Sequence, residues 1–518
     1  MNMLPTTLSR RHFHQLIWGS LALGGLQAMS GEPIYGESDV KPASPPLTTN
    51  GSFKAASNQF AIQFLKSVID SQPSKNQFLS PFSIESALLM TMEGARGQTA
   101  AEMGQALGFP QSVKADDPKA PWQLASVRSD LKSIVQSFYR GDSAAEVEVR
   151  KTLKQKRSEL DKANARAVAL SQKGNFNDAV KESNGARQLA DQINELSKTV
   201  DKYELRNANG LWIDKSFVLK PEYQNLIRQS YSAALENVDF ASNPAAQGEK
   251  INRWISDNTQ QKINNIIPPG TITKITRLVL ANAIYFRGTW QDPFDPGQTK
   301  PGRFQNIGNQ QVEVPMMSKF CKSGRYAAFQ SDGAPFETPR TLEVGSDPKA
   351  GYPKDGFQVM ELGYNGGDLQ MWIALPQAKS GLKAMIESLD GSKLDNWDSA
   401  LQHRDVTLVM PKFKLEATYD LQENLEQLGM KSAFDPNQAD FSGMSQETVF
   451  ISKVLHKSFV DVNEKGTEAA AATVVMMAPS AMAQVPFIPS FVADHPFLFM
   501  IRHRPSGTIL FAGLVQQL

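Results

Sequence analysis

A serine and a histidine are the first residues to consider for chemistry. Ser80 and His456 could act as the nucleophile and the base of a hydrolase. The sequence contains no GxSxG, HExxH or phosphate-binding glycine motif to support this interpretation. Its single cysteine, Cys321, excludes an intramolecular disulfide and a CxxC metal site. We therefore expect no enzyme activity, no bound metal and no cofactor.

A second pattern is a segment whose residues fit two different structures. Residues 464–479 have this pattern. Four consecutive alanines, residues 469–472, favour a helix, whereas the β-branched residues 473–475 favour a strand. In a strand, one face would carry only small or apolar side chains: Thr467, Ala469, Ala471, Thr473, Val475 and Met477. Such a strand fits between two others over a packed core, so the segment is predicted to be either an exposed loop or a buried strand.

Two other segments would have to position this one. Residues 455–462, directly before it, alternate as a sheet strand does. One face carries His456, Ser458, Val460 and Val462, and the other carries Leu455, Lys457, Phe459 and Asp461. Residues 278–290 form a near-continuous apolar run, which is typical of a strand buried on both faces.

Several of these segments resemble one family. Residues 464–470, Glu-Lys-Gly-Thr-Glu-Ala-Ala, resemble the hinge of inhibitory serpins, the serine protease inhibitors that trap their targets. Residues 76–87, 203–212 and 495–513 resemble further serpin segments, in the same order. The resemblance spans about residues 58–518 and implies an α+β serpin fold, with a large mixed β-sheet, helices and an exposed reactive loop. We place the serpin domain at residues 51–518.

The resemblance also implies a set of site residues. The hinge would comprise Glu464, Gly466, Thr467, Glu468, Ala469, Ala470, Ala471 and Ala472. A buried cluster beneath the main sheet, where strands must part, would comprise Ser80, Ser83, Asn282 and His456, with Trp290 at the top of the sheet. This placement puts Ser80 and His456 in the sheet interior and not in an active site.

By the same resemblance, the chain is a suicide substrate. A target serine protease would attack the loop, form an acyl-enzyme and be trapped as the cleaved loop inserts into the sheet. Counting along the loop as in the family places the cut between Ser480 and Ala481, while neighbouring bonds within residues 477–482 stay open. A small residue before the cut suits elastase-like or subtilisin-like proteases, and a cysteine protease is a further possible target. The alternative is a non-inhibitory serpin that acts as a carrier or binding protein.

Two segments depart from the family pattern. Residues 141–201 are predicted to form an inserted antiparallel helical hairpin with a turn at Gly174 and Asn175. The hairpin could be a partner-binding arm, a cofactor site or a solvated ornament. Residues 328–356, rich in Gly, Pro and charge, are predicted to form a surface loop.

The N-terminal residues have the pattern of a targeting signal. Arg10 and Arg11, followed by Phe13 and an apolar run over residues 16–28, resemble a twin-arginine export signal and imply a bacterial-type family member. We place the signal peptide at residues 1–30 and a flexible linker at residues 31–50. The apolar run is shorter than the roughly 20 residues that span a bilayer, although an N-terminal membrane anchor is the alternative.

These patterns lead to an expectation about location and partners. We expect a secreted monomer, periplasmic or in the extracellular space, without stable membrane insertion after the signal is removed. The formal net charge of +1 gives no overall attraction to nucleic acid, so we expect no nucleic-acid partner.

Overall fold

The computed structural model describes residues 51–138, 144–173, 175–200, 203–231, 233–465 and 484–518 of the 518-residue chain. The predicted export signal and linker lie outside the described residues. So do Gly466, Thr467, Glu468 and the four hinge alanines, together with the predicted reactive bond between Ser480 and Ala481. The helices are α1 (Ser52–Ser71), α2 (Pro81–Met92), α3 (Gly97–Ala106), α4 (Leu124–Phe138), α5 (Ala144–Gln172), α6 (Phe176–Val200), α7 (Pro221–Ser230), α8 (Pro244–Asn258), α9 (Leu382–Glu387), α10 (Lys393–Ala400) and α11 (Gln422–Gln427).

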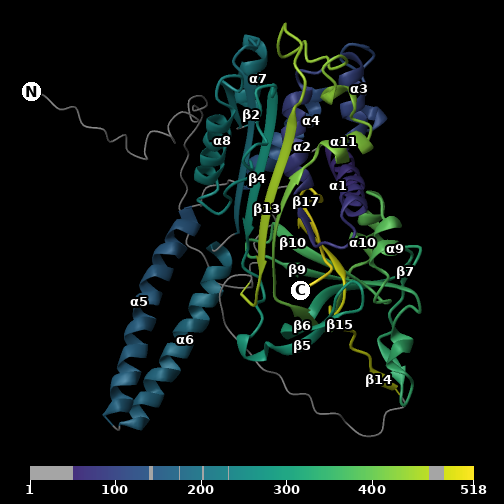
Figure 1. The fold of residues 1–518 in the computed structure, drawn as a ribbon. Helices are drawn as coiled ribbons and strands as arrows, with labels where there is room; N and C mark the ends of the chain where they lie inside the picture. The colour runs from purple at the N-terminus through teal and green to yellow at the C-terminus, as the bar shows by residue number, and fades with distance from the viewer. Residues whose placement is uncertain (1–50, 139–143, 174, 201–202, 232, 466–483) are drawn as a thin grey trace, which may run out of the picture. The chain divides into compact units, whose positions relative to one another are not determined.

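A five-stranded sheet contains both strands that were expected to position the loop (Figure 1). Its order is β12 (Phe413–Asp420), β13 (Lys453–Val462), β4 (Leu278–Arg287), β2 (Glu204–Asp214) and β3 (Ala234–Val238). The β12–β13 and β2–β4 pairs are antiparallel, whereas the central β13–β4 pair is parallel. β4 is buried along its length except at Arg287, as its apolar run predicts.

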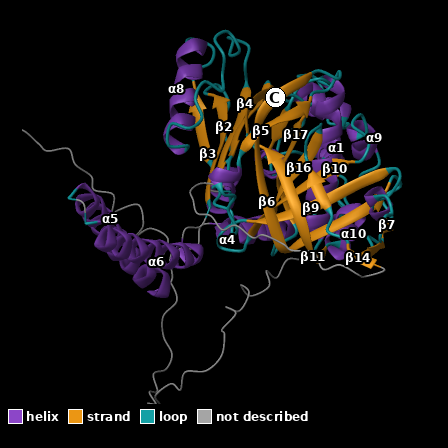
Figure 2. Cartoon of the chain, turned by 90° about the horizontal axis from the view of Figure 1, so that it is seen from below, coloured by secondary structure: helices purple, strands orange, loops and turns teal. Residues whose placement is uncertain are grey.

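A ten-stranded sheet makes up much of the remaining body (Figure 2). Its main path is β1 (Gln77–Leu79), β17 (Thr508–Val515), β16 (Phe497–His503), β10 (Leu369–Pro376), β9 (Gly356–Gly363), β6 (Gln311–Gln330), β11 (Gln402–Pro411) and β15 (Ser490–Val492). β5 (Lys300–Gln305) and β7 (Pro335–Phe336) also pair with β6.

Helix α2 lies in the core between the two sheets. Each of its residues is buried, and it packs against β4 of one sheet and β17 of the other. The opposite face of the five-stranded sheet carries a second apolar cluster, in which Trp212 and Val279 pack with Ile255 of α8. Cover on both faces explains why the central strands are so apolar.

Residues 328–356 are more ordered than the predicted surface loop. They contain β7, a second short strand, β8 (Thr341–Glu343), and a 3-10 turn (Pro348–Gly351). β8 pairs antiparallel with β14 (Gln484–Pro486), which lies on the C-terminal side of the predicted reactive bond. Most of the segment is exposed, as predicted for a surface loop, but its short strands were missed, because strand pairing with a segment about 140 residues away has no local sequence signal.

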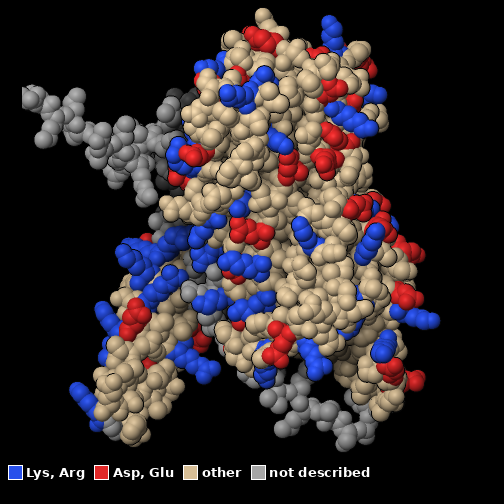
Figure 3. All heavy atoms as spheres, viewed as in Figure 1, with Lys and Arg blue, Asp and Glu red and all other residues tan. Residues whose placement is uncertain are grey.

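Helices α5 and α6 occupy the segment for which the sequence predicts two helical arms. They pack on each other through a seam that includes Leu153, Ala163, Ala179 and Ala186, and Arg166 forms an ion pair with Glu182 at 3.0 Å. Within the part of the chain that the structure describes, no helix is both long and apolar enough to cross a membrane. On the face in Figure 3, Lys and Arg side chains gather across the left and centre at mid-height, whereas Asp and Glu side chains are more frequent toward the right.

Candidate functional site

The central feature of the site is the seam between β4 and β13. The two strands pair from Lys453 opposite Val279 to Phe459 opposite Tyr285. β13 then leads through residues 463–465 into the predicted reactive loop. A chain that turned back after β13 would run antiparallel to both seam strands. The seam is therefore a place where one strand could be added with two antiparallel pairings, which are slightly more stable per residue than the parallel pairing they would replace.

A buried polar cluster lies beneath the seam. His456 of β13 and Asn282 of β4 face each other, with 2.5 Å between His456 Nδ1 and Asn282 Oδ1. The Ser80 backbone N–H donates to His456 Nε2 at 3.1 Å. Since Nε2 accepts this bond, the proton of the neutral ring belongs on Nδ1, which donates to Asn282. One imidazole thus ties both seam strands to the start of α2.

The two serines complete this cluster through α2. Ser80 Oγ accepts from the Ser83 backbone N–H at 3.2 Å and so caps the helix. Ser83 Oγ donates to Asn207 Oδ1 of β2 at 2.6 Å. Asn282 Nδ2 donates to the Ser83 carbonyl oxygen at 3.1 Å and also contacts Asn209 Oδ1. The structure therefore brings Ser80, Ser83, Asn282 and His456 together; their role in sheet opening stays a prediction.

The same geometry bears on the hydrolase interpretation of Ser80 and His456. Ser80 Oγ donates to the Leu510 carbonyl oxygen at 2.6 Å, and His456 Nε2 is occupied by a backbone N–H. Both side chains are fully buried. Burial lowers the pKa of His456 to about 3. These two residues therefore do not form an accessible nucleophile–base pair.

Trp290 and Phe294 close the end of the seam nearest the loop. Trp290 Nε1 donates to the Asn463 carbonyl oxygen at 3.0 Å, and the Trp290 backbone N–H donates to the Lys465 carbonyl oxygen at 3.2 Å. The Phe294 backbone N–H donates to the Glu464 carbonyl oxygen at 2.8 Å. Trp290 is itself fixed by stacking on Tyr364, with ring centroids 4.5 Å apart. We refer to these contacts on residues 463–465 as the clamp.

The Glu464 side chain adds further contacts that hold residues 463–465 in place. Its Oε2 lies 2.9 Å from Lys412 Nζ, and its Oε1 accepts from Thr299 Oγ1 at 2.8 Å. Although burial acts to raise the pKa of Glu464, the hydrogen bonds from Lys412 and Thr299 hold it below its ordinary value. The sequence predicted Glu464 as part of the hinge, and it missed both partners because they lie on distant segments.

The chain is also held where it returns from the loop. In the β8–β14 ribbon, Thr341 Oγ1 donates to Gln484 Oε1 at 2.8 Å, and the Phe487 backbone N–H donates to the Arg340 carbonyl oxygen at 2.9 Å. The Phe487 ring packs edge-on against Tyr352 at 5.4 Å. Residues 466–483 therefore lie between two anchored ends, of which sequence reasoning found only the first.

Known proteins resemble this chain over most of its length. The family model described as "Serpin (serine protease inhibitor)" matches residues 55–518. Serpin B6 of Pongo abelii is 33% identical over 460 residues, covering 88% of this chain and 97% of that protein. Leukocyte elastase inhibitor of Bos taurus is 34% identical over 470 residues, covering 89% and 97% respectively.

Solved structures show the same fold. A crystal structure of native protease nexin-1 with heparin has a TM-score of 0.64 at 24% identity, and one of uncleaved ovalbumin has a TM-score of 0.65 at 22% identity. Each match covers 90% of this chain and 100% of the matched chain.

The buried imidazole predicts a pH effect on stability. The folded protein keeps His456 neutral down to a pKa of about 3, whereas the unfolded chain takes up a proton near 6.5. The stabilisation is therefore complete above pH 6.5 and is lost as the pH falls toward 3. Between pH 7 and pH 5 this residue should remove about 2 kcal/mol from the free energy of unfolding. Urea denaturation of the wild type and His456→Gln at both pH values measures the difference.

The comparison between variants is needed because burial also raises the pKa of Glu85 to about 8. The contribution of Glu85 is complete below pH 4.5 and is lost as the pH rises toward 8, so it acts in the opposite direction. The matched control for replacing a histidine is His403→Gln, because this exposed side chain lies on β11, outside the cluster beneath the seam. An identical pH dependence in His456→Gln and the wild type would contradict the prediction.

The clamp predicts unequal effects for two glutamates that each pair with one lysine. Glu464→Ala should lower the free energy of unfolding by about 2 kcal/mol, because it leaves the Thr299 hydroxyl and Lys412 without their buried acceptor. Glu416 pairs with Lys457 at 2.8 Å, but its side chain is 55% exposed, so Glu416→Ala should cost less than about 1 kcal/mol. Urea midpoints at neutral pH compare the two, and equal losses would show that the clamp adds nothing.

Proposed function

This chain belongs to the serpin family, and we propose that it inhibits a serine protease by acting as a suicide substrate. The protease cuts the reactive loop, and the cut loop inserts between β4 and β13 before the acyl-enzyme is hydrolysed. The observation that carries this proposal is the closed parallel seam, followed along the chain by a sequence that, as a strand, would place small and apolar side chains on one face.

Strand addition supplies the free energy for insertion. A strand entering the seam exchanges one parallel pairing for two antiparallel pairings and buries its apolar face. Each backbone hydrogen bond gained contributes about 1 kcal/mol net, so a strand of a dozen residues contributes on the order of 10 kcal/mol. The opposing cost is the loss of the His456–Asn282 contact and of the clamp on residues 463–465. Strand addition exceeds this cost once cleavage frees the loop.

The order of events decides whether the protease is trapped. The protease nucleophile attacks the carbonyl carbon of Ser480 and forms an ester with it. The bond from this carbon to the Ala481 nitrogen breaks, and the peptide that begins with Ala481 leaves as an amine. Water would then hydrolyse the ester and free the enzyme. Insertion faster than hydrolysis moves the tethered protease and distorts its active site. The rate of strand entry therefore separates an inhibitor from a substrate.

The residues around the cut favour one class of target. No Lys or Arg lies between Thr467 and Phe491, so a trypsin-like specificity pocket has no partner there. A small residue such as Ser480 before the cut suits elastase-like and subtilisin-like proteases. Incubation with both classes, with a trypsin-like enzyme for comparison, should give a complex stable on a denaturing gel only with the first two. Mass spectrometry of the released C-terminal peptide then locates the cut.

Two adjacent hinge residues test the insertion step. Thr467 would face inward in the inserted strand and Glu468 outward. Thr467→Arg should reduce the fraction of stable complex by at least about tenfold, since burying an unpaired charge costs several kcal/mol and slows insertion. Glu468→Arg is the matched control and should inhibit nearly as well as the wild type. Equal inhibition by both variants, measured on the denaturing gel, would exclude strand entry through this segment.

Cleavage of the loop without a trapped protease tests the stored free energy. A chain nicked within residues 477–482 should melt roughly 10 °C or more above the intact chain, because it gains strand pairing and apolar burial. Differential scanning calorimetry of both forms measures this rise. A carrier or binding protein with the same fold needs no insertion, so an unchanged melting temperature would favour that alternative.

A further inference from the structure

A cavity of about 850 Å³ lies beside Trp290. Segments from four parts of the chain line it: residues 290–292, the middle of β6, the end of β9 and the start of β11, with Arg504 after β16. Its apolar lining includes Met360, Leu362, Leu401 and Cys321. Burial raises the pKa of the Cys321 thiol to about 11, so this residue adds no charge.

The charged residues of the lining give the cavity a positive balance. Four cations, Lys319, Lys322, Arg325 and Arg504, accompany two carboxylates, Asp292 and Glu361. Among these, Glu361 is almost completely buried and is already occupied by cationic partners. Asp398 also pairs with Arg325 from beside the cavity, so the positive balance is smaller than the lining alone gives. An incoming ligand with a negative charge still meets the more favourable potential.

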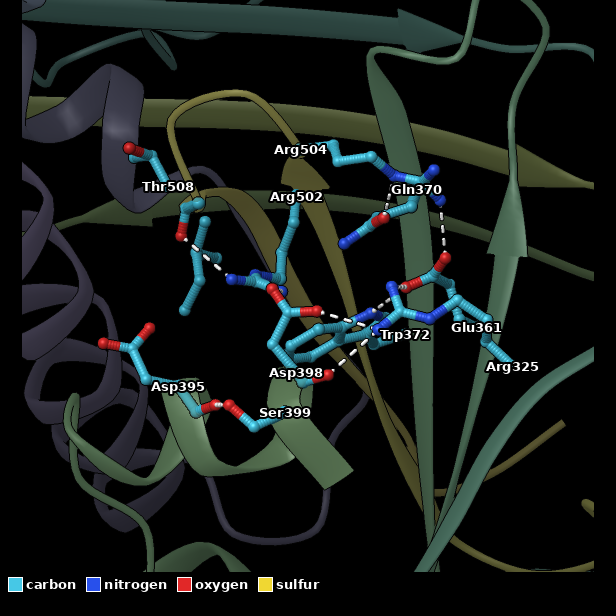
Figure 4. A network of polar contacts seen from close by, with 12 residues as sticks. Arg325, Glu361, Gln370, Trp372, Asp395, Asp398, Ser399, Arg502, Arg504 and Thr508 are labelled. Carbon is cyan, nitrogen blue, oxygen red and sulfur yellow. Dashed lines mark hydrogen bonds and ion pairs between the residues drawn. The ribbon is translucent and has the colours of Figure 1, made fainter. Parts of the chain in front are cut away.

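The two guanidinium groups are held in place before any ligand arrives (Figure 4). Glu361 accepts from Arg325 Nη1 at 2.9 Å, from Arg504 Nη2 at 2.5 Å and from Trp372 Nε1 at 3.0 Å. Asp398 Oδ1 accepts from Arg325 Nη2 at 3.1 Å, and Gln370 Oε1 accepts from Arg504 Nε at 2.7 Å. Fixed donors lose little side-chain entropy when an anion binds, which raises the affinity that each contact can provide.

A backbone irregularity shapes the wall next to Lys322. Ser323 has a φ of 55°, in the left-handed region that few residues other than glycine adopt. The Ser323 backbone N–H donates to Asp405 Oδ1 at 3.0 Å, and its carbonyl oxygen lies 2.9 Å from His403 Nδ1. The β6–β11 register shifts at this point, between Arg404 and Val406. Exposed Lys322 lies at this kink and lines the cavity.

The cavity adjoins the residues that form the clamp. Lys319 forms an ion pair with Asp292 at 3.3 Å, and its ammonium group lies over the Phe294 ring at 4.7 Å. The Phe294 backbone N–H holds the Glu464 carbonyl oxygen, and Trp290, which lines the cavity, holds Asn463 and Lys465. A molecule in the cavity therefore touches the segment that must release residues 463–465 before a strand can enter the seam.

We propose that this cavity binds a small organic anion, a carboxylate or phosphate on a compact apolar body, and that bound anion keeps the clamp closed. Binding to the closed form in preference to the opened form stabilises the closed form by mass action. The second half of this proposal rests on the proposed function, because it concerns strand entry. Bound anion slows insertion, so more of the protein is cut as an ordinary substrate.

Calorimetric titration of the intact chain with 1-naphthoate tests the site directly. We expect one site per chain, and we expect the isosteric neutral 1-naphthamide to bind at least about fivefold more weakly, since it lacks the charge-assisted contacts. Lys322→Gln should weaken naphthoate binding by a similar factor. Lys354→Gln removes an exposed lysine outside the cavity and should leave binding unchanged. If naphthoate and naphthamide bind equally well, or if both variants lose the same amount of naphthoate affinity, the proposed binding site is wrong.

Coupling to the clamp has a separate readout. With an elastase-like protease, saturating naphthoate should lower the fraction of stable complex at least twofold in the wild type and in Lys354→Gln, and less in Lys322→Gln at the same concentration. If naphthoate binds but the fraction of stable complex does not change, the proposed coupling to the clamp is wrong, while the proposed binding site still stands. Absence of stable complex at every naphthoate concentration would overturn the inhibitor function, while the calorimetric result would still stand.

Discussion

The parallel pairing of β4 with β13 is the constraint on which the other features of the site depend. It places two strands side by side in the one relative direction that allows the chain after β13 to fold back between them with antiparallel partners on both sides. The neighbouring β12–β13 and β2–β4 pairs are antiparallel and can move with the strands they hold. The proposed insertion would therefore open the sheet at its centre without loss of its flanking pairs.

Both ends of the intervening chain are fastened, and they are fastened by different means. At the start, residues 463–465 are held by backbone hydrogen bonds from Trp290 and Phe294 and by the Glu464 carboxylate. At the end, β14 is held by pairing with β8. Only the first of these anchors lies on the seam, so the proposed strand entry requires only that one to release. The second would stay in place on the C-terminal side of the proposed cut.

The sequence predicted the strands of the site better than their contacts. Alternation over residues 455–462 and the apolar run over residues 278–290 identify β13 and β4 because these patterns follow from the faces each strand buries. The link between Ser80 and His456 spans 376 residues, and no local pattern encodes it, so it came from family resemblance alone. The Lys412 and Thr299 contacts to Glu464, the β8–β14 ribbon and the cations of the cavity were missed for the same reason. Each depends on the register between distant segments.

Under the proposed mechanism, the polar character of the cluster beneath the seam would give the sheet two discrete states. An apolar core at this place could open gradually, since each small separation exposes only a little more surface. The contacts of His456 and Asn282 instead join groups that are fully buried, and a partial opening would leave them without partners and without water. Such an intermediate costs more than either the closed sheet or a sheet with a strand inserted. Under the proposed mechanism, the cluster would therefore oppose opening until the entering strand, with its own hydrogen-bonding groups, takes the place of the lost partner.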